Sequence, residues 1–370
     1  MRVPFIDLKT QYSEVQATVE ASFAEILSSG AYVLGRFNKE LEEDLAKRHK
    51  VKHGIAVNSG TDALRIMMQA AGIGPGDEVI VPTFTFVATV EVVVQIGATP
   101  VFADIDAATF CLDPEAVRKA ITPKTKAILP VHLYGQLADV KAFEAIAKEH
   151  GLLVFEDGAQ AVLSHHEGTY TGAWGSASAL SFYVTKNLGA AGDGGLILTN
   201  DDEVARRSRS LRIHGMGRER YYYDEIGYTS RMPELQAAFL CAKLARLDDW
   251  NARRAAVAAT YLNELAGLPI HLPVTSPGNH HTWHQFSVRT PDRDALMAHL
   301  KEREIDSAIY YPVPLHLHEP YAHFGHGKGS LPVTEEVSDQ VLCLPIHQNL
   351  ADDQVAWVVE SIRSFATAKV

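Results

Sequence analysis

The chain has 370 residues, of which 46% are hydrophobic and 21% are charged, and its formal net charge is −11. This composition is typical of a globular protein with a substantial core, and the length predicts two domains. The acidic balance argues against a nucleic-acid binder and against a protein that binds anionic membranes, because both need a basic face. It still allows an anionic small substrate, since a few arginines can hold a phosphate inside an acidic protein.

The cysteines and the N-terminal segment bear on the cellular compartment. Cys111, Cys241 and Cys343 are far apart and odd in number, so they predict neither a disulfide framework nor a C-x-x-C metal pair. The segment MRVPFIDLKTQY at residues 1–12 lacks the apolar core of a signal peptide, and no run of about 18 uncharged apolar residues occurs in the sequence. We therefore expect a soluble cytoplasmic protein.

Between about residues 50 and 200, short apolar segments alternate with helical patterns. Residues 61–71 and 139–150 carry apolar side chains at helical spacing. The strand candidates around them are DEVIVP, TPVFADI, TKAILPVHLYG, GLLVFED, ALSFYV and GGLILTN. Strands that are apolar almost throughout and are separated by helices predict a mostly parallel sheet that is covered on both faces.

The pattern changes after residue 230, where residues 232–265 predict a long helical region that leads out of the sheet-containing part. Three further elements are predicted beyond it: a strand at 282–290, an amphipathic helix at 292–305 and a second strand at 307–314. We therefore expect two domains: a large domain over residues 1–250, in which 1–30 form a packing or substrate segment, and a smaller C-terminal α/β domain over residues 251–370.

Two features that resemble motifs of other functions lack the required context. GIGPGD at residues 72–77 precedes a strand instead of opening a helix after one, and GAAGDGG at 189–195 lacks the G-x-G-x-x-G spacing. A dinucleotide-binding oxidoreductase therefore has little support. Four histidines between residues 316 and 326 lie in a predicted loop without a companion carboxylate or cysteine pattern, so we expect no metal site there.

Two other motifs place polar residues where α/β proteins bind ligands. In NSGTDAL (58–64) a predicted helix begins near Gly60 and Thr61, whose free N–H groups and hydroxyl favour an anion. A plain N-cap by Ser59 or Thr61 explains the same pattern. In GLLVFEDGAQ (151–160), Asp157 follows a buried strand, where ligands of open sheets gather, although a turn carboxylate would give the same pattern.

The stretch SFYVTKNLGAAGDGG at residues 181–195 places one lysine, Lys186, between an apolar run and a glycine-rich bend. Alone, Lys186 could be a solvated charge, a phosphate ligand or a covalent nucleophile. Together with the helix start and Asp157 it supplies what pyridoxal phosphate needs: an amine for a Schiff base, donors for the phosphate and an acid against the pyridine nitrogen. The carboxylate keeps that nitrogen protonated, because an opposite charge favours the charged form.

The motifs NSGTDAL, EDGAQ, SFYVTKNLGAAGDGG and GYTSRMPELQAAFL resemble the DegT/DnrJ/EryC1/StrS family of pyridoxal-phosphate-dependent nucleotide-sugar aminotransferases, and the resemblance covers nearly the whole chain. It implies an α/β fold of the aspartate-aminotransferase type (fold type I), with a mostly parallel seven-stranded sheet covered by helices. It also implies a homodimer with active sites shared between the subunits.

The resemblance assigns roles to individual residues. It implies that Lys186 forms the internal aldimine with the cofactor and then acts as base and acid in the proton shift. Asp157 matches the partner of the pyridine nitrogen, and Gln160 matches the glutamine near the ring hydroxyl. The remaining cofactor ligands that it implies are Gly60, Thr61 and Ser181 at the phosphate, and Phe86 stacked on the pyridine, with Phe84 close enough to be the alternative.

Some positions depart from the family pattern. Thr229 stands where most members carry an asparagine that reaches the phosphate from the partner subunit, so this cofactor contact depends on a shorter side chain. Tyr310 stands where close relatives often have a histidine near the sugar. Together with Tyr183 and with Arg231, which matches an arginine that contacts the sugar acid in some members, Tyr310 forms the set of substrate-binding candidates.

The implied reaction moves an amino group from L-glutamate to a nucleotide-diphosphate-linked keto sugar in amino-sugar biosynthesis. The C-terminal motifs favour a 3-keto sugar, while a 4-keto sugar or a cyclitol ketone remains the alternative. Members that became dehydratases carry histidine in place of the lysine, so Lys186 favours transamination. A regulatory protein that binds the cofactor without turnover is the less favoured reading.

Overall fold

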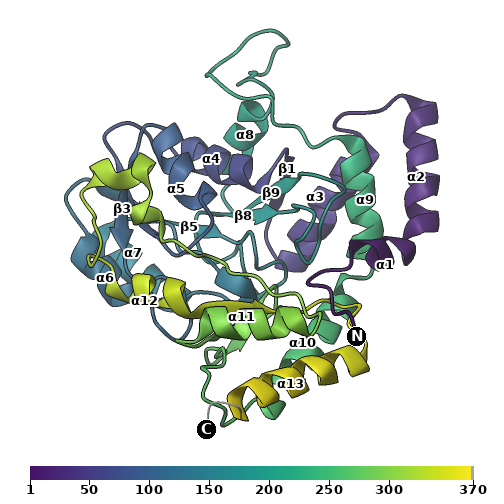
Figure 1. Ribbon diagram of the computed structural model, residues 1–370. Coiled ribbons are helices and arrows are strands. Elements are labelled where there is room, and N and C mark those ends of the chain that lie inside the picture. The colour runs from purple at the N-terminus through teal and green to yellow at the C-terminus, as the bar shows by residue number, and fades with distance from the viewer. Residues whose placement is uncertain (368–370) are drawn as a thin grey trace.

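The computed structural model describes residues 1–367. Its centre is a seven-stranded sheet in the order β1-β9-β8-β5-β4-β2-β3 (Figure 1). Strand β9 runs antiparallel to both neighbours, and the other neighbouring pairs are parallel, which confirms the predicted mostly parallel sheet. The strands are β1 (His53–Val57), β2 (Glu78–Pro82), β3 (Thr99–Ala103), β4 (Thr125–Ile128), β5 (Leu153–Asp157), β8 (Ala177–Ser181) and β9 (Gly195–Thr199).

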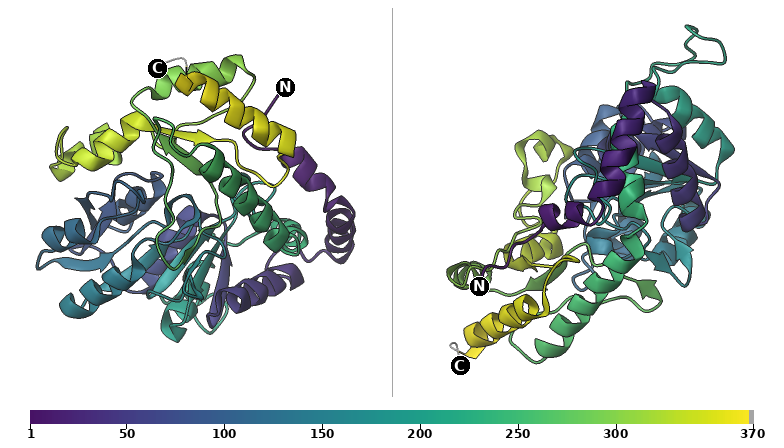
Figure 2. Two further views of the ribbon diagram at one scale, coloured as in Figure 1. Left: turned by 90° about the horizontal axis from the view of Figure 1, so that it is seen from below. Right: turned by 90° about the vertical axis from the view of Figure 1, so that its right-hand side faces the viewer.

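Helices cover both faces of this sheet (Figures 1 and 2). Because successive strand residues point to opposite faces, Phe155 of β5 packs into one apolar cluster and Val154 into another. The Phe155 face is covered by α4 (Gly60–Ala70), α5 (Ala88–Gln95) and α8 (Asp202–Leu211). The opposite face is covered by α3 (Arg36–His49), α6 (Pro114–Ala120), α7 (Val140–His150) and α9 (Glu234–Leu244). The helices predicted at 61–71 and 139–150 are thus confirmed as α4 and α7.

The C-terminal part is built on α10 (Leu247–Glu264), so the helical region predicted at 232–265 consists of two helices, α9 and α10. An antiparallel ribbon of β11 (Phe286–Arg289) and β12 (Val341–Leu344) packs with helices into a separate apolar cluster. The helices of this part are α11 (Arg293–Glu302), α12 (Pro332–Gln340) and α13 (Asp352–Thr367).

The second predicted strand, at 307–314, is wrong. Only Ala308 bridges to Cys343, and the chain from 309 to 314 forms no ladder. The physical reason is that Pro312 and Pro314 have no N–H group to donate to a neighbouring strand. The predicted strand at 282–290 shortens to β11.

The N-terminal segment lies against the C-terminal part. Val3 bridges to Ile305, and the amide of Gln354 on α13 donates to the carbonyl of Arg2 at 3.0 Å. Figure 2 shows the N-terminal strand-like segment beside α13 in both views. The chain then forms α1 (Leu8–Ser13) and α2 (Gln16–Ser29). Short elements complete the fold: β6 (His165–His166), β7 (Thr169–Tyr170), β10 (Asn279–His280) and the 3-10 turns Leu133–Gly135, Leu315–Leu317 and Glu319–Phe324.

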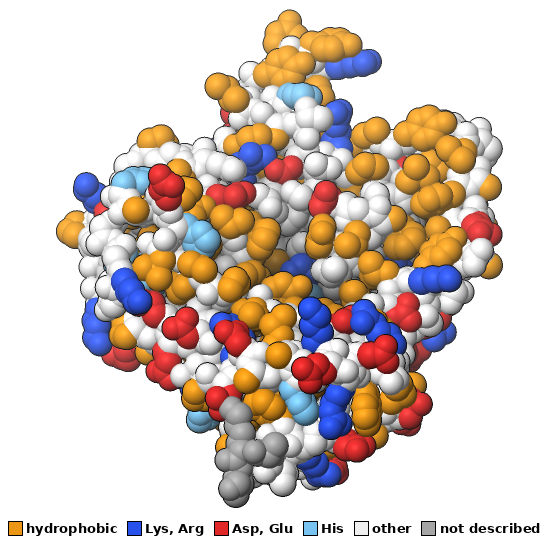
Figure 3. All heavy atoms as spheres, in the orientation of Figure 1, with side chains coloured by type: hydrophobic (Ala, Val, Ile, Leu, Met, Phe, Trp, Pro, Cys, Tyr) orange, Lys and Arg blue, Asp and Glu red, His pale blue; other side chains and the backbone are white. Residues whose placement is uncertain are grey.

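One hairpin stands out from the body between α8 and α9, and we call residues 213–229 the projecting loop (Figure 1). Its outer part exposes several large hydrophobic side chains among charged ones: Ile226 is 90% exposed and Tyr221 69% exposed. Hydrophobic side chains are exposed on this outer part and over the same face of the molecule (Figure 3). Among residues 1–367, none of the helices combines the length and the apolar character needed to cross a membrane.

Candidate active site

The site begins where β1 and β8 end on either side of β9. Val57 and Ser181 both pair with Gly195, so the chain leaving β1 passes directly beside the end of β8. A Cβ on Gly195 would lie 2.2 Å from the carbonyl oxygen of Ser59, and a Cβ on Gly60 would lie 2.7 Å from the Cβ of Ser181. Both glycines are therefore required for the start of α4 to approach Ser181.

The start of α4 has the properties of an anion site. The hydroxyl of Ser59 accepts from the N–H of Asp62 at 3.1 Å, so Ser59 is the N-cap and Thr61 is not. Within residues 1–367 the hydroxyl of Thr61 makes no hydrogen bond. The first N–H groups of a helix have no intrahelical partner and carry a partial positive charge, so Gly60, Thr61 and the adjacent Ser181 hydroxyl can together receive a phosphate.

Asp157 ends β5 on the face covered by α5, and its carboxylate is buried. One oxygen accepts from the hydroxyl of Thr89 at 2.7 Å, and Thr89 in turn contacts the hydroxyl of Thr85 at 2.9 Å. The other oxygen accepts from the N–H of Ala159 at 3.1 Å. Burial raises the pKa of Asp157, and the hydrogen bonds and the nearby charge of Lys186 offset this only in part. A cation placed beside this carboxylate would therefore be held strongly.

Lys186 lies in the loop after β8 and is partly buried. Its backbone N–H donates to the carbonyl of Tyr183 at 2.8 Å. Burial lowers the pKa of Lys186 to about 8, while the charge of Asp157 acts in the opposite direction. An appreciable fraction of the amine is therefore neutral near neutral pH, which is what a nucleophilic lysine requires.

Gln160 has a fixed orientation beside this pair. Its oxygen accepts from the N–H of Tyr134 at 2.7 Å, so its NH2 group faces the hydroxyl of Tyr311 at 3.2 Å. The Tyr311 ring lies 6.2 Å from the ring of Phe84 and 6.4 Å from that of Phe86. Phe84 is 1% exposed and Phe86 56% exposed, so Phe86 is the ring that remains accessible to a ligand. Sequence reasoning missed Tyr311, because it singled out only Tyr310 from the tyrosine pair.

Of the remaining predicted residues, Tyr310 adjoins this cluster, because its ring lies 5.8 Å from that of Tyr311. Tyr183 is 51% exposed, and Tyr310 is partly buried with its ring 6.1 Å from that of Phe5. Thr229 is exposed, and its hydroxyl pairs with the ring of His214 at 3.0 Å. Arg231 is partly buried and follows Ser230, whose hydroxyl donates to the Asp62 carboxylate at 2.6 Å. Thr229 and Arg231 thus lie one residue from a group fixed at the start of α4.

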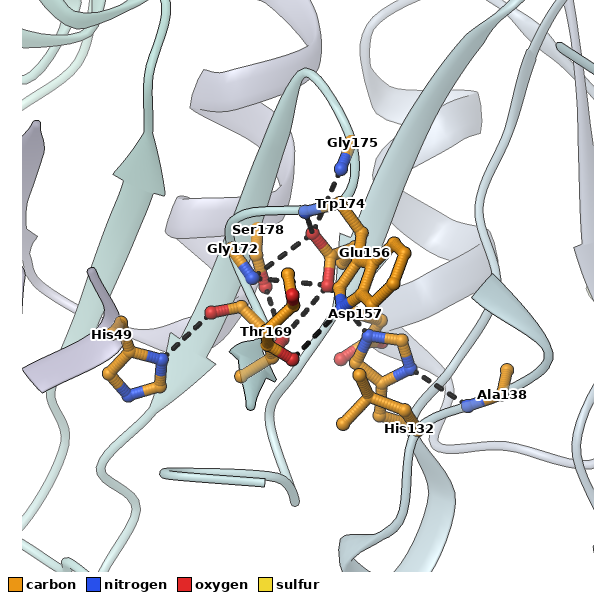
Figure 4. A network of polar contacts seen from close by, with 12 residues as sticks. His49, His132, Ala138, Glu156, Asp157, Thr169, Gly172, Trp174, Gly175 and Ser178 are labelled. Atoms are coloured by element: carbon orange, nitrogen blue, oxygen red, sulfur yellow. Dashed lines mark hydrogen bonds and ion pairs between the residues drawn. The ribbon is translucent and has the colours of Figure 1, made fainter. Parts of the chain in front are cut away.

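The side chain of the glutamate that precedes Asp157 faces the opposite side of the sheet and lies in a network with His132, whose backbone N–H also donates to the carbonyl of Asp157 (Figure 4). Glu156 is fully buried, and His132 donates to it at 2.8 Å. Its other donors are the Thr171 hydroxyl at 3.1 Å and the backbone N–H groups of Gly172, Trp174 and Gly175 at 3.0 to 3.2 Å. This network fixes the loop before β8, and both oxygens of Glu156 are occupied by donors from the described part of the chain.

These positions can be tested against pyridoxal phosphate as a bound group. The start of α4 offers N–H and hydroxyl donors beside Ser181, and Gly60 leaves the space that a Cβ would fill. The buried carboxylate of Asp157 and the amine of Lys186, whose pKa is lowered by burial, interact electrostatically. The residues present therefore fit an anionic phosphate, a ring cation and an aldehyde, which are the three groups of this cofactor.

Comparison with known proteins identifies the family. The family model of the DegT/DnrJ/EryC1/StrS aminotransferases matches residues 13–363. The chain belongs to this family. Its membership confirms the expected aminotransferase activity, the α/β fold and the dependence on pyridoxal phosphate.

Similar proteins cover almost the full length. A dTDP-3-amino-3,4,6-trideoxy-alpha-D-glucose transaminase from Streptomyces venezuelae is 48% identical, with 99% of this chain and 96% of that protein aligned. A pleiotropic regulatory protein from Geobacillus stearothermophilus is 46% identical, with 99% of both chains aligned. A UDP-N-acetyl-3-dehydro-alpha-D-glucosamine 3-aminotransferase from Acidithiobacillus ferrooxidans is 42% identical, with 98% of this chain and 97% of that protein aligned.

Two solved structures share the whole fold. The crystal structure of S. venezuelae DesV in complex with a ketimine intermediate has a TM-score of 0.96 at 48% identity, covering 99% of this chain and 98% of that one. The crystal structure of NtdA from Bacillus subtilis with bound cofactor PMP has a TM-score of 0.93 at 32% identity, covering 99% of this chain and 85% of that one.

Proposed function

We propose that this aminotransferase transfers the amino group of L-glutamate to C3 of a nucleotide-diphosphate-linked 3-keto sugar, in the cytoplasm, and releases 2-oxoglutarate. The observation that carries the proposal is that the buried carboxylate of Asp157 ends β5 next to β8, whose last residue, Ser181, lies against the start of α4, while Lys186 follows in the same loop. The preference for C3 is supported by the names of similar proteins, a dTDP-3-amino sugar transaminase and a UDP-sugar 3-aminotransferase.

Each residue near the cofactor has a proposed task. Lys186 Nζ would bind the cofactor aldehyde and, once released, would carry a proton to and from the reacting carbon. Asp157 holds the proton on the ring nitrogen, so that the bound ring can accept electrons from the substrate carbon. The phosphate is held by Gly60, Thr61 and Ser181, the ring hydroxyl by Gln160 and the ring face by Phe86.

The sugar is proposed to lie against Tyr183, Arg231 and Tyr310. The ring of Phe5 packs 6.1 Å from that of Tyr310, so the N-terminal segment borders this subsite. We also propose that residues 1–250 form the large domain and 251–370 the small one, since the seven-stranded sheet precedes residue 250 and the β11–β12 ribbon follows it.

We propose that the protein is a homodimer in which the projecting loop of one subunit reaches the site of its partner. The outer part of the loop carries Tyr221, Tyr222 and Ile226, each more than half exposed. Further hydrophobic side chains are exposed on the face of the molecule seen in Figure 3. An apolar face of this kind is costly in a monomer. In such a dimer Thr229 would approach the phosphate of the pyridoxal phosphate bound in the other subunit. Sedimentation of the cofactor-loaded protein as an active monomer would exclude this arrangement.

A regulatory role without turnover is the second candidate, because one relative is described as a pleiotropic regulatory protein. The present chain, however, retains both Lys186 and Asp157, which a binding-only protein would not need. A 4-keto sugar or a cyclitol ketone is the alternative acceptor.

The test has two half-reactions. First, L-glutamate is added to the cofactor-loaded protein, and we expect the absorbance of the bound aldehyde form to convert to that of the amine form. Second, the amine form is mixed with dTDP- and UDP-linked 3-keto and 4-keto hexoses and with a cyclitol ketone, and the aminated product is identified by mass spectrometry. Lys186→Ala is the control, and it should leave no covalent adduct after borohydride reduction. No spectral change with glutamate would contradict turnover, and amination of 4-keto sugars alone would contradict the C3 assignment.

A further inference from the structure

The residue after the candidate nucleophile is held by two parts of the chain at once, helix α10 and the segment 282–284. Asn187 is buried, and its NH2 group donates to the carbonyl oxygen of Thr282 at 2.8 Å and to the side-chain oxygen of Asn251 on α10 at 2.9 Å. Its own oxygen lies 3.2 Å from Nδ1 of His284. All the hydrogen-bonding groups of the Asn187 side chain are thereby engaged, and none of these partners belongs to the seven-stranded sheet.

This arrangement determines the tautomer of His284. A backbone carbonyl only accepts, so the contact with Thr282 fixes which end of Asn187 is the NH2 group. The oxygen of Asn187 must then face His284, and Nδ1 of His284 must carry the proton and donate. Burial holds the pKa of His284 well below its ordinary value, with the charges of Lys186 and Arg254 acting in the same direction. The ring is therefore neutral, with Nε2 unprotonated.

The segment that carries His284 is itself firmly held. The N–H of Thr282 donates to the carbonyl of Gly135 at 2.8 Å, and the guanidinium of Arg254 donates to the carbonyls of Trp283 at 3.1 Å and of Ile346 at 2.8 Å. A Cβ on Gly135 would lie 2.9 Å from the backbone nitrogen of Trp283, so the approach of the two segments depends on glycine. His284 thus presents its Nδ1–H from a fixed position.

We propose that His284 and Asn187 are positioning residues for Lys186: the Nδ1–H of His284 orients Asn187, and Asn187 fixes the loop that carries the amine. This inference rests on the proposed function, in which Lys186 is the residue that binds the cofactor aldehyde. It assigns roles to two residues that lack a recognisable catalytic pattern in the sequence. Through them the C-terminal part of the chain, which contributes His284 and Asn251, holds the nucleophile of the sheet-containing part.

The experiment compares two amides at position 284. In His284→Asn the side-chain nitrogen occupies the place of Nδ1 and still donates to Asn187, whereas in His284→Gln it occupies the place of Nε2 and leaves Asn187 without its donor. Pyridoxal 5′-phosphate is added to each cofactor-free protein, and the rate at which it forms an adduct with Lys186 is followed by absorbance. Borohydride reduction and peptide mass spectrometry establish that the adduct is on Lys186.

We expect His284→Asn to react within about threefold of the wild-type rate and His284→Gln to react about tenfold or more slowly, the size of effect expected from one lost hydrogen bond. His281→Asn is the matched control, because His281 is buried on the same segment and stacks on Trp283 at 3.8 Å, while its Nδ1 accepts from the N–H of Trp283 instead of contacting Asn187. This control should react at the wild-type rate.

Equal rates for the two position-284 variants, or a slower reaction of the asparagine variant, would overturn the proposal. Should neither variant fold, Asn187→Asp decides the question, because a carboxylate accepts from His284 and cannot donate to Thr282. A wild-type rate in Asn187→Asp would contradict the proposal, and a rate reduced about tenfold would support it. Failure of wild-type Lys186 itself to form the adduct would instead contradict the proposed function.

Discussion

Glu156 and Asp157 are consecutive residues of β5, yet their surroundings differ in kind. Glu156 accepts hydrogen bonds from His132, from a hydroxyl and from three backbone N–H groups, so both oxygens are fully engaged (Figure 4). Asp157 accepts one bond at each oxygen, from Thr89 and from the N–H of Ala159. The difference follows from the pleat, because neighbouring strand residues face opposite sides of the sheet.

The pKa values of the two carboxyl groups depart in opposite directions. Burial raises both, but at Glu156 the hydrogen bond and charge of His132 and the backbone N–H groups more than offset it, so its pKa lies below the ordinary value. At Asp157 the partners do not offset burial, and the pKa is raised. A carboxylate offers about four lone-pair sites. A saturated carboxylate therefore stabilises a fold, whereas one with spare acceptor capacity can hold a ligand cation.

The largest expected effect is the loss of stability in Glu156→Gln. The amide turns an NH2 group toward N–H donors, and the Nε2–H of His132 cannot turn away because its Nδ1 accepts from the N–H of Ala138. The free energy of unfolding should fall by about 2–5 kcal/mol, since each buried donor that loses its acceptor costs about 1–3 kcal/mol. Urea unfolding of the cofactor-free protein at fixed concentration measures this. Glu149→Gln is the control, since Glu149 is an exposed carboxylate paired with Arg118, and it should change stability by less than about 1 kcal/mol. An equal loss of stability in Glu156→Gln and Glu149→Gln would show that the hydrogen bonds around Glu156 do not stabilise the fold.

Asp157→Asn should show the converse pattern, with chemistry lost and stability kept. The charge of Asp157 should raise the pKa of the cofactor's ring nitrogen by about 1–3 units, the usual effect of a close opposite charge. Without it the protonated fraction of that nitrogen falls by about 10- to 1000-fold, and the glutamate half-reaction should slow by the same factor. At neutral pH the cofactor-free variant should unfold at the urea concentration of the wild type or slightly above it, because the substitution removes a buried charge whose pKa is raised by burial. A variant with normal turnover would show that Asp157 is not the partner of the ring nitrogen.

A smaller effect is expected from the two threonines that donate to these carboxylates. Thr89 supplies one of two hydrogen bonds to Asp157, whereas Thr171 is one donor among several to Glu156. Thr89→Val should raise the pKa of Asp157 further and move the acidic limb of the kcat/KM profile upward by about one pH unit. Thr171→Val should lower stability and leave the profile in place. A shift of the same size in both variants would mean that the limb does not report on Asp157.

The sequence could predict Asp157 and Lys186 because both follow apolar strands within recognisable motifs. It could not separate Glu156 from Asp157, since the distinction lies in which face each side chain takes and in partners such as His132 on another strand end. His284 escaped notice because its role depends on the orientation of an amide distant in sequence. The sequence also pointed to Tyr310 and not to Tyr311. The strand predicted at 307–314 does not form, so the alternation of strand residues could not indicate which of the two tyrosines faces Gln160.

The smallest expected effect is on the acid dependence of stability. The pKa of Glu156 is lower in the folded chain than its ordinary value of 4.5, so the stability it contributes is complete above about pH 4.5 and is lost as the pH falls through the folded pKa. The pKa of Asp157 is raised above 3.8, so its contribution is present in acid and is lost as the pH rises from about 3.8 through the folded pKa.

Glu156→Gln should therefore flatten the fall in unfolding free energy below about pH 4.5, and Asp157→Asn should steepen the rise just above about pH 3.8. Each change is bounded at about 1.4 kcal/mol per pH unit, the most that one titrating group contributes. Urea unfolding of the cofactor-free variants at closely spaced pH values measures both slopes against the wild type. Slope changes of the same sign in the two variants would show that the environments of Glu156 and Asp157 do not differ in the way that their hydrogen bonds indicate.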